Sequence, residues 1–257
     1  MKKFRFGTIH ADFLTQKEAL DIIESLATAG KGGMVVTPNV DHVVQAESNP
    51  ALRNVYEHAA LSLVDGMPLK WMSALLGHPL PEKISGSDLV RPLLKRAAEK
   101  RLKVYFLGSA PGVGQKAADI LRKEMPSLKI VGIESPPVGF ERDETTERNI
   151  MDKVIAAKPD FVLVALGCPK QELLMARWYK QLSPAVLLGI GASLDFIAGR
   201  IQRSPAWMSR MGAEWLYRLA KDPKRLVKRY LVHDIAIVPI FLKMCRTAKA
   251  DRVFFKD

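Results

Sequence analysis

Short, uninterrupted apolar runs recur through the first 190 residues, and a stretch with helical spacing follows almost every one of them. The runs occupy residues 34–37, 61–64, 104–107, 130–133, 161–166 and 185–190. A continuous apolar run is typical of a strand buried on both faces, whereas a strand with one wet face alternates apolar and polar positions. Helical stretches of about ten to fifteen residues between such strands favour parallel pairing. The pattern predicts an α/β fold in which helices cover both faces of a mainly parallel sheet.

Local start and stop signals support this division into elements. Residues 4–14 predict a strand or hairpin, and Thr15 with Glu18 forms the capping box of the helix that follows. Pro50 opens the second of two helical pieces in residues 41–59. The chain shows no internal repeat and no low-complexity segment.

The character of the chain changes near residue 199, where the apolar strand runs stop. Residues 206–246 predict two helices broken at Asp222-Pro223. From residue 200 to the end there are fourteen Lys and Arg against five acidic residues, a net charge of +9 out of the chain's +12. Trp, Tyr and aliphatic residues are interleaved with these charges. We therefore divide the chain into an α/β domain (1–198) and a basic, amphipathic appendage (199–257).

Composition limits the class of protein. With 257 residues, 48% of them hydrophobic, the chain is long enough for one large domain or a large and a small one. No run reaches the roughly 18 apolar residues of a membrane span, and the N-terminus lacks the apolar core of a signal peptide. Two cysteines provide neither a disulfide scaffold nor a metal framework, which fits a reducing cytoplasm.

The strong positive charge indicates an anionic partner. The basic segment has three interpretations: a solvated helical face, a surface for nucleic-acid phosphates, or a surface for anionic lipid headgroups. The mixture of Trp, Tyr and aliphatic residues at helical spacing favours the membrane surface. The sequence contains no recognisable nucleic-acid-binding module, so we expect no nucleic-acid partner.

Polar residues follow four of the predicted strands, at the edge where doubly wound sheets bind ligands. They are Thr37, Asn39, Asp65, Gln171 with its neighbour Glu172, and Asp195. Each of them alone is typical of a turn or a helix cap. Together they predict a site at the carboxyl edge of the sheet, where Asp65 can serve as a general base.

The glycine-rich segment 108–114 also follows a strand and opens a helix. It can offer backbone N–H groups to a phosphate, or it can be a tight structural turn. It matches neither the dinucleotide fingerprint nor the P-loop pattern. The sequence shows no Asp-x-Asp pair and no His or Cys residues at the spacing of metal ligands, so we expect no cofactor and no metal. Arg, Lys and helix dipoles would then carry the charge of any phosphate.

Seven sequence blocks give the chain a specific resemblance. They are TPN at 37–39, DGMP at 65–68, PEKISGSDL at 81–89, FLGSAPGVG at 106–114, LGCPKQE at 166–172, GIGASLDFIAGRIQRSP at 189–205 and EWLYRLAKDPKRLVKRY at 214–230. With these blocks in this order, the chain resembles the WecG/TagA/CpsF family of bacterial glycosyltransferases, glycosyltransferase family 26, nearly from end to end.

The resemblance implies a Rossmann-like core and an appendage that reaches the cytoplasmic face of the cell membrane, where the protein would be peripheral. It implies an inverting, metal-independent transferase that moves a sugar from a UDP-sugar to a polyprenyl-diphosphate-linked saccharide. The product would feed teichoic acid, common antigen, capsule or exopolysaccharide. Family members transfer N-acetylmannosamine, its uronic acid or hexoses, and the sequence does not choose among them. The resemblance leaves a homo-oligomer open.

The resemblance also assigns roles to residues of the sheet edge. Asp65 looks like the general base, and Thr37 and Asn39 look like its neighbours in the catalytic pocket. Gln171 is expected to position a substrate. Gly108 and Asp195 resemble the nucleotide-binding part.

Basic residues are expected to meet the phosphates. The family usually has Arg where this chain has Lys83, which keeps the charge but loses the bidentate fork. Arg218, Arg225 and Arg229 of the appendage are expected to hold the acceptor diphosphate at the membrane.

The sequence leaves two other functions open. One is a non-catalytic or dinucleotide-dependent nucleotide-binding protein, against which the missing glycine fingerprint argues. The other is a nucleic-acid-binding protein that uses the basic segment.

Overall fold

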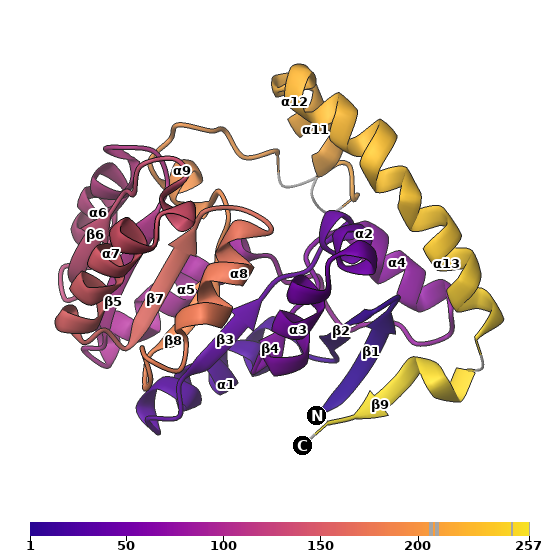
Figure 1. Cartoon of the computed structure of the whole chain (residues 1–257), viewed down its shortest axis with the longest axis horizontal. Coiled ribbons are helices and arrows are strands. Elements are labelled where there is room, and N and C mark those ends of the chain that lie inside the picture. Colours follow the sequence, from indigo (N-terminus) through magenta and orange to yellow (C-terminus); the bar gives the residue numbers. More distant parts are fainter. Residues whose placement is uncertain (206–207, 209–210, 248, 257) are drawn as a thin grey trace.

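A six-stranded, all-parallel sheet forms the centre of the protein, in the order β4-β3-β8-β7-β5-β6 (Figure 1). This computed structural model describes residues 1–205, 208, 211–247 and 249–256. The strands are β3 (Gly33–Val36), β4 (Leu61–Ser62), β5 (Lys103–Gly108), β6 (Lys129–Glu134), β7 (Phe161–Ala165) and β8 (Val186–Gly189). The predicted α/β class with a mainly parallel sheet is confirmed.

Helices cover both faces of this sheet (Figure 1). They are α1 (Gln16–Thr28), α2 (Val40–Ser48), α3 (Pro50–His58), α4 (Met67–Leu75), α5 (Gly86–Glu99), α6 (Val113–Glu124), the 3₁₀ turn η1 (Phe140–Arg142), α7 (Glu144–Ala157), α8 (Lys170–Trp178) and α9 (Ser193–Ile197). The sequence patterns anticipated most of these helices, including the break at Pro50 and the capping box of α1.

The central strands send alternate side chains into two separate cores. On β7, Val162 and Val164 belong to one apolar cluster, whereas Phe161 and Leu163 belong to the other. Helices α1, α5 and α6 bury their apolar residues in the second cluster, and α3, α7 and α8 bury theirs in the first. Because both faces are covered, the central strands β3, β7 and β8 are apolar and buried along nearly their whole length.

A second, antiparallel sheet joins the two ends of the chain, in the order β2-β1-β9. Its strands are β1 (Lys2–Phe6), β2 (Ile9–Asp12) and β9 (Val253–Phe255). The expectation that strands stop near residue 199 is therefore wrong. The two termini lie side by side (Figure 1), and the N–H of Lys256 donates to the carbonyl of Met1 over 3.1 Å.

The segment from 214 to 252 is largely helical, with the predicted break at Asp222-Pro223; the start of the predicted helix at 206–210 lies largely outside the described residues. The segment contains α11 (Glu214–Lys221), α12 (Pro223–Lys228), the π-helical turn η2 (Arg229–His233), the 3₁₀ turn η3 (Asp234–Ala236), α13 (Ile237–Arg246) and the 3₁₀ turn η4 (Lys249–Arg252). Among the described residues, none of the helices combines the length and the apolar character needed to cross a membrane.

The end of this segment packs onto the rest of the protein. Met244 is buried in the first core cluster, and Ile237, Ile240 and Phe241 pack against it. The buried Arg252 donates to three carbonyl oxygens, those of Leu76, Cys245 and Thr247. The domain boundary at residue 199 stays a prediction. The stretch from α13 to β9 packs against β1 and α2.

A buried carboxylate connects the two sheets. Asp12, at the end of β2, is 4% exposed and forms an ion pair with Lys3, which is 2% exposed. Its second oxygen, Oδ2, accepts the backbone N–H of Ser62 on β4 over 2.7 Å. The hydroxyl of Ser62 donates to the carbonyl of His10. The antiparallel hairpin is thus fixed to the edge of the parallel sheet through Asp12.

We predict that Asp12→Ala lowers the free energy of unfolding by about 3–5 kcal/mol, because it leaves the Lys3 ammonium buried without its partner. Urea denaturation followed by circular dichroism measures this loss. Asp152→Ala serves as the matched control, since Asp152 pairs with Arg148 on an exposed face of α7, and it should cost less than about 1 kcal/mol. Equal losses for the two variants would contradict the role of Asp12.

Candidate functional site

A cavity of about 390 Å³ opens at the carboxyl edge of the parallel sheet, between the ends of β3 and β4 and the C-terminal helices. Polar residues from both sides line it: Asn39, Asp65, Lys83, Glu214, Arg229 and Asp234. The rest of the wall is largely apolar and includes Val40, Met67, Pro68, Trp215, Tyr230, Ile235, Ile237 and Val238. The cavity therefore combines charged groups with an apolar wall.

Asp65 reaches the cavity because of how the chain leaves β4. Its backbone N–H donates to the carbonyl of Pro38 over 2.8 Å, which sets the two strand ends side by side. Gly66 follows with φ of +107° and turns the chain into α4. A side chain at position 66 would be strained in this conformation. The sequence block DGMP thus places the Asp65 carboxylate in the cavity wall.

Asn39 connects the sheet edge to the C-terminal segment. It caps α2, and its Oδ1 accepts the N–H of Asp41 over 3.0 Å. The same oxygen accepts from Nη2 of Arg229 over 3.4 Å. Arg229 also forms an ion pair with Asp41 at 3.3 Å. Its guanidinium is thereby held beside Asn39 in the cavity wall.

Lys83 also lines the cavity. Its Nζ is 2.6 Å from Oδ2 of Asp88, which also pairs with Arg203. Burial tends to raise the pKa of Asp88, but Lys83, Ser85 and Arg203 outweigh it and hold that pKa at about 2. Because Asp88 stays ionised, it anchors the Lys83 ammonium at the cavity as a fixed positive charge.

Thr37 and Gln171 are buried and are not among the described residues that line the cavity. The Thr37 hydroxyl donates to the carbonyl of Gly189 over 3.5 Å. The Gln171 side chain, 3% exposed, accepts the N–H groups of Gly167 and Gly191 at 3.2 and 3.1 Å. Thr37 thus contacts the end of β8, and Gln171 joins the loops that follow β7 and β8.

Two further predicted residues lie elsewhere on the same edge. Gly108 ends β5 with φ of +107°, and a Cβ there would come within 2.5 Å of the carbonyl oxygen of Ala165, so only glycine fits. Asp195, at the start of α9, pairs with Arg200 at 3.1 Å. Neither lines the cavity.

Arg218 and Arg225 lie on α11 and α12, but their side chains fall outside the described part of the structure. Their predicted contact with an acceptor diphosphate stays a prediction.

The cavity wall also contains two acidic residues that the sequence motifs do not indicate, Glu214 and Asp234. The sequence signal that could have identified them is their place in the basic segment, close to its aromatic residues.

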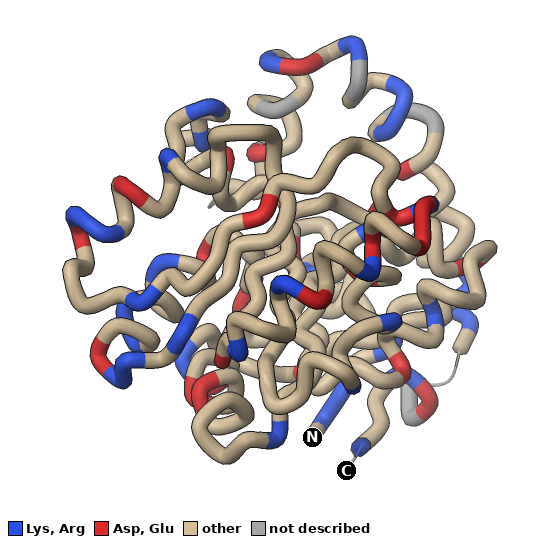
Figure 2. The backbone as a smooth tube through the Cα atoms, turned by 60° about the vertical axis from the view of Figure 1, so that its left-hand side comes forward, with Lys and Arg blue, Asp and Glu red and all other residues tan. Residues whose placement is uncertain are grey.

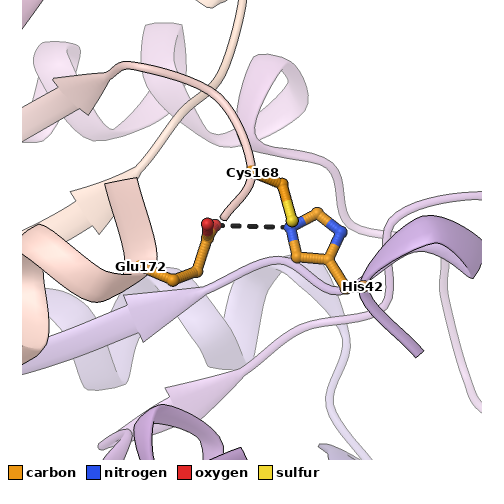
Figure 3. A group of neighbouring side chains, drawn as sticks. All are labelled: His42, Cys168 and Glu172. Atoms are coloured by element: carbon orange, nitrogen blue, oxygen red, sulfur yellow. Dashed lines mark hydrogen bonds and ion pairs between the residues drawn. The ribbon is translucent and has the colours of Figure 1, made fainter. Parts of the chain in front are cut away.

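A second cluster of chemically active side chains also escaped the sequence analysis (Figure 3). His42, Cys168 and Glu172 come together from α2, from the loop after β7 and from α8, with one donor atom of each within 4.8 Å of the others. Burial would lower the pKa of His42, but Cys168 and Glu172 raise it well above its ordinary value. Metal-ligand spacing is sought within short segments, and His42 and Glu172 are 130 residues apart.

The pKa of Asp234 is shifted in the opposite direction from that of Asp88. Burial raises the pKa of Asp234 to about 6, and although Arg229 opposes this, the carboxylate of Asp41 adds to it. A carboxyl whose pKa is higher in the native state than in the unfolded state stabilises the fold when protonated. This stabilisation is complete below the ordinary pKa of 3.8 and is lost as the pH rises through about 6.

We predict that Asp234→Asn removes this pH dependence. Relative to the unsubstituted protein, the variant should gain about 2 kcal/mol in unfolding free energy between pH 4.5 and pH 7.5. Urea denaturation at both pH values measures the gain. Asp152→Asn is the exposed control. Its unfolding free energy relative to the unsubstituted protein should differ by less than about 0.5 kcal/mol between pH 4.5 and pH 7.5. If Asp234→Asn changed the unfolding free energy equally at both pH values, the raised pKa of Asp234 in the native state would be refuted.

The sequence is also similar to those of known proteins. A family model described as "Glycosyl transferase WecG/TagA/CpsF family" matches residues 4–251. An N-acetylglucosaminyldiphosphoundecaprenol N-acetyl-beta-D-mannosaminyltransferase from Bacillus spizizenii is 34% identical over 195 residues, which cover 76% of this chain and 74% of the relative.

Enzymes with the same name from two other bacteria are similar. The Bacillus subtilis enzyme is 30% identical over 194 residues, covering 76% of this chain and 73% of the relative. The Staphylococcus aureus enzyme is 30% identical over 218 residues, covering 85% and 80%. The match to the family model over nearly the whole chain decides the assignment, and this protein belongs to the WecG/TagA/CpsF family of glycosyltransferases.

Proposed function

We propose that this protein transfers a sugar from a UDP-sugar to a polyprenyl-diphosphate-linked saccharide, with inversion at the anomeric carbon. One observation carries the proposal: a single cavity brings the Asp65 carboxylate together with Lys83, Arg229 and an apolar wall. A base, fixed positive charges and an apolar surface are the groups that such a reaction requires.

Asp65 acts as the general base in this proposal. It removes the proton from the acceptor hydroxyl while that oxygen attacks the anomeric carbon of the donor sugar. The bond from this carbon to the diphosphate of UDP breaks in the same step, and the electron pair leaves with UDP. A single displacement from the opposite face inverts the configuration. The hydrogen bond between the Asp65 N–H and the Pro38 carbonyl fixes the backbone from which this carboxylate projects.

Fixed cations stabilise the diphosphates in the proposed reaction. Preorganised positive charge is effective where negative charge develops, because it requires no rearrangement during the reaction. Lys83 is held by Asp88, and Arg229 is held by Asn39 and Asp41. No bound metal is needed for the leaving UDP in this mechanism.

The apolar side of the cavity suits an acceptor that carries a lipid. Trp215, Ile235 and Val238 line the same cavity as the polar residues. The relatives are named for an acceptor that joins N-acetylglucosamine to undecaprenol through a diphosphate, and for the transfer of N-acetylmannosamine. We propose this donor and acceptor pair as the first to test.

We further propose that the C-terminal helices rest on an anionic membrane surface. Leu216, Val227 and Leu242 are 47%, 42% and 54% exposed and do not line the cavity. Lys and Arg recur along α11 and α12, at the top of the view in Figure 2. Exposed aliphatic residues among basic ones are typical of helices at the lipid interface. The membrane and acceptor contacts would thus both belong to residues 199–257.

Asp65→Asn should reduce transfer about 10²- to 10⁴-fold, because the amide cannot accept the proton of the acceptor hydroxyl. Release of UDP from UDP-N-acetylmannosamine in the presence of the lipid-linked acceptor measures the rate. The affinity for UDP, measured by calorimetry, should stay within about twofold, since the charge of Lys83 and Arg229 is unchanged.

The control is Asp152→Asn, which changes a carboxylate on the exposed face of α7 and should keep the unsubstituted rate. An Asp65→Asn variant with a near-normal rate would show that Asp65 is not the base. Calorimetry with NAD tests the dinucleotide alternative, and tight NAD binding without UDP binding would overturn the proposed function.

We expect Leu216→Ser/Leu242→Ser to weaken binding to vesicles of phosphatidylglycerol and phosphatidylethanolamine at least about fivefold, because it removes apolar surface from the lipid-facing side. Flotation of the full chain with vesicles measures the bound fraction. Val131→Ser/Val138→Ser removes two exposed aliphatic side chains around β6, at the far edge of the sheet, and should not change binding. Equal effects of the two double variants would place the membrane contact elsewhere.

A further inference from the structure

The cluster of His42, Cys168 and Glu172 is a group of possible metal ligands outside the cavity (Figure 3). His42 is 5% exposed and Glu172 is fully buried, so water does not compete freely for their polar atoms. Nε2 of His42 lies 3.3 Å from Oε1 of Glu172. The Cys168 sulfur points toward the same ring nitrogen in Figure 3. Three different donor types therefore converge on one buried point.

A neighbouring side chain orients each of the three donors. Nδ1 of His42 is 2.9 Å from Oδ1 of Asn39, which directs the other ring nitrogen toward the cluster. Nε2 of Gln171 donates to Oε1 of Glu172 over 2.7 Å. Nε2 of Gln45 donates to the Cys168 sulfur over 3.6 Å. Outer partners of this kind fix metal ligands in known sites.

One buried atom of the cluster has no partner. Among the residues that the structure describes, nothing donates to Oε2 of Glu172. The ring of Tyr56 meets that of His42 edge-on at 6.5 Å, and its buried hydroxyl likewise finds no partner within the described part of the chain. Leaving a buried carboxylate oxygen unsatisfied costs free energy. A pair of His42 and Glu172 alone uses Oε1 and does not account for Oε2.

We infer that His42, Cys168 and Glu172 form a binding site for a divalent cation of the zinc class. Thiolate, imidazole and carboxylate are the ligands that Zn²⁺ prefers, and a tetrahedral site places its donors about 3.3–3.8 Å apart. The three donor atoms lie within 4.8 Å of one another, so small side-chain movements bring them to this spacing. The cation satisfies Oε2 of Glu172, and its fourth position stays open to water.

The site is distinct from the transfer chemistry. No step of the proposed reaction passes through the cation. Its effect is on position, because a cation bound to His42 fixes the ring that contacts Asn39 in the cavity wall. It also fixes the loop that carries Cys168 against α2. Metal binding can be measured without any sugar substrate, so this inference and the proposed function fail independently.

Cobalt titration of the full chain tests the inference. After treatment with a chelator, the protein should bind one Co²⁺ per chain and show the near-ultraviolet charge-transfer band of a cobalt–thiolate bond. Added Zn²⁺ should displace the cobalt and remove the band. Cys168→Ser should abolish the band. The chain offers a matched control in its only other cysteine, the exposed Cys245, and Cys245→Ser should retain the band.

Two further measurements guard against a variant that fails to fold. Glu172→Gln keeps the size of the side chain and should weaken Zn²⁺ binding at least about tenfold. Zn²⁺ should raise the melting temperature of the unsubstituted protein and of Cys245→Ser but not that of Cys168→Ser. Absence of the thiolate band in the unsubstituted protein would overturn the inference. So would equal cobalt binding by Cys168→Ser, or loss of the band in Cys245→Ser.

Discussion

The side-chain amide of Gln171 is the contact on which the carboxyl edge of the sheet depends. Its oxygen accepts the N–H groups of the loops that leave β7 and β8, and its nitrogen donates to the buried Glu172. From there, contacts continue through His42 to Asn39 and then to Arg229. Hydrogen bonds are directional, so each contact fixes the orientation of the next side chain. The place of Arg229 in the cavity is thus tied to the centre of the sheet.

Most of the central fold was predictable because its signals are local. Continuous apolar runs identify strands buried on both faces, and the capping residues of α1 and the proline of α3 mark where helices begin. Strand β9 was not predictable in this way. It pairs Phe255 with Lys2 at the other end of the chain, and a three-residue strand carries no periodic pattern of its own. The short β4 has only two paired residues, although Leu63 and Val64 continue its burial.

Those residues of the candidate site that lie at strand ends or in the family's sequence blocks were predictable. Asn39, Asp65, Lys83 and Arg229 do meet in one cavity. The sequence could not show that the Gln171 side chain contacts the loops after β7 and β8, because the direction of a buried amide depends on backbone groups far away in the chain. Nor could it show the meeting of His42 with Cys168, which α2 and the β7 loop bring together only in three dimensions.

The pairing of β9 with β1 has a consequence for the helices that precede it. It fastens residues 199–257 at both ends, to α9 through the chain and to the N-terminal hairpin through hydrogen bonds. A loop closed at both ends samples fewer conformations than a tail attached at one end. Its basic residues therefore stay within reach of the cavity at a high effective concentration. An anionic ligand held by these helices would meet the sheet edge in what amounts to an intramolecular encounter.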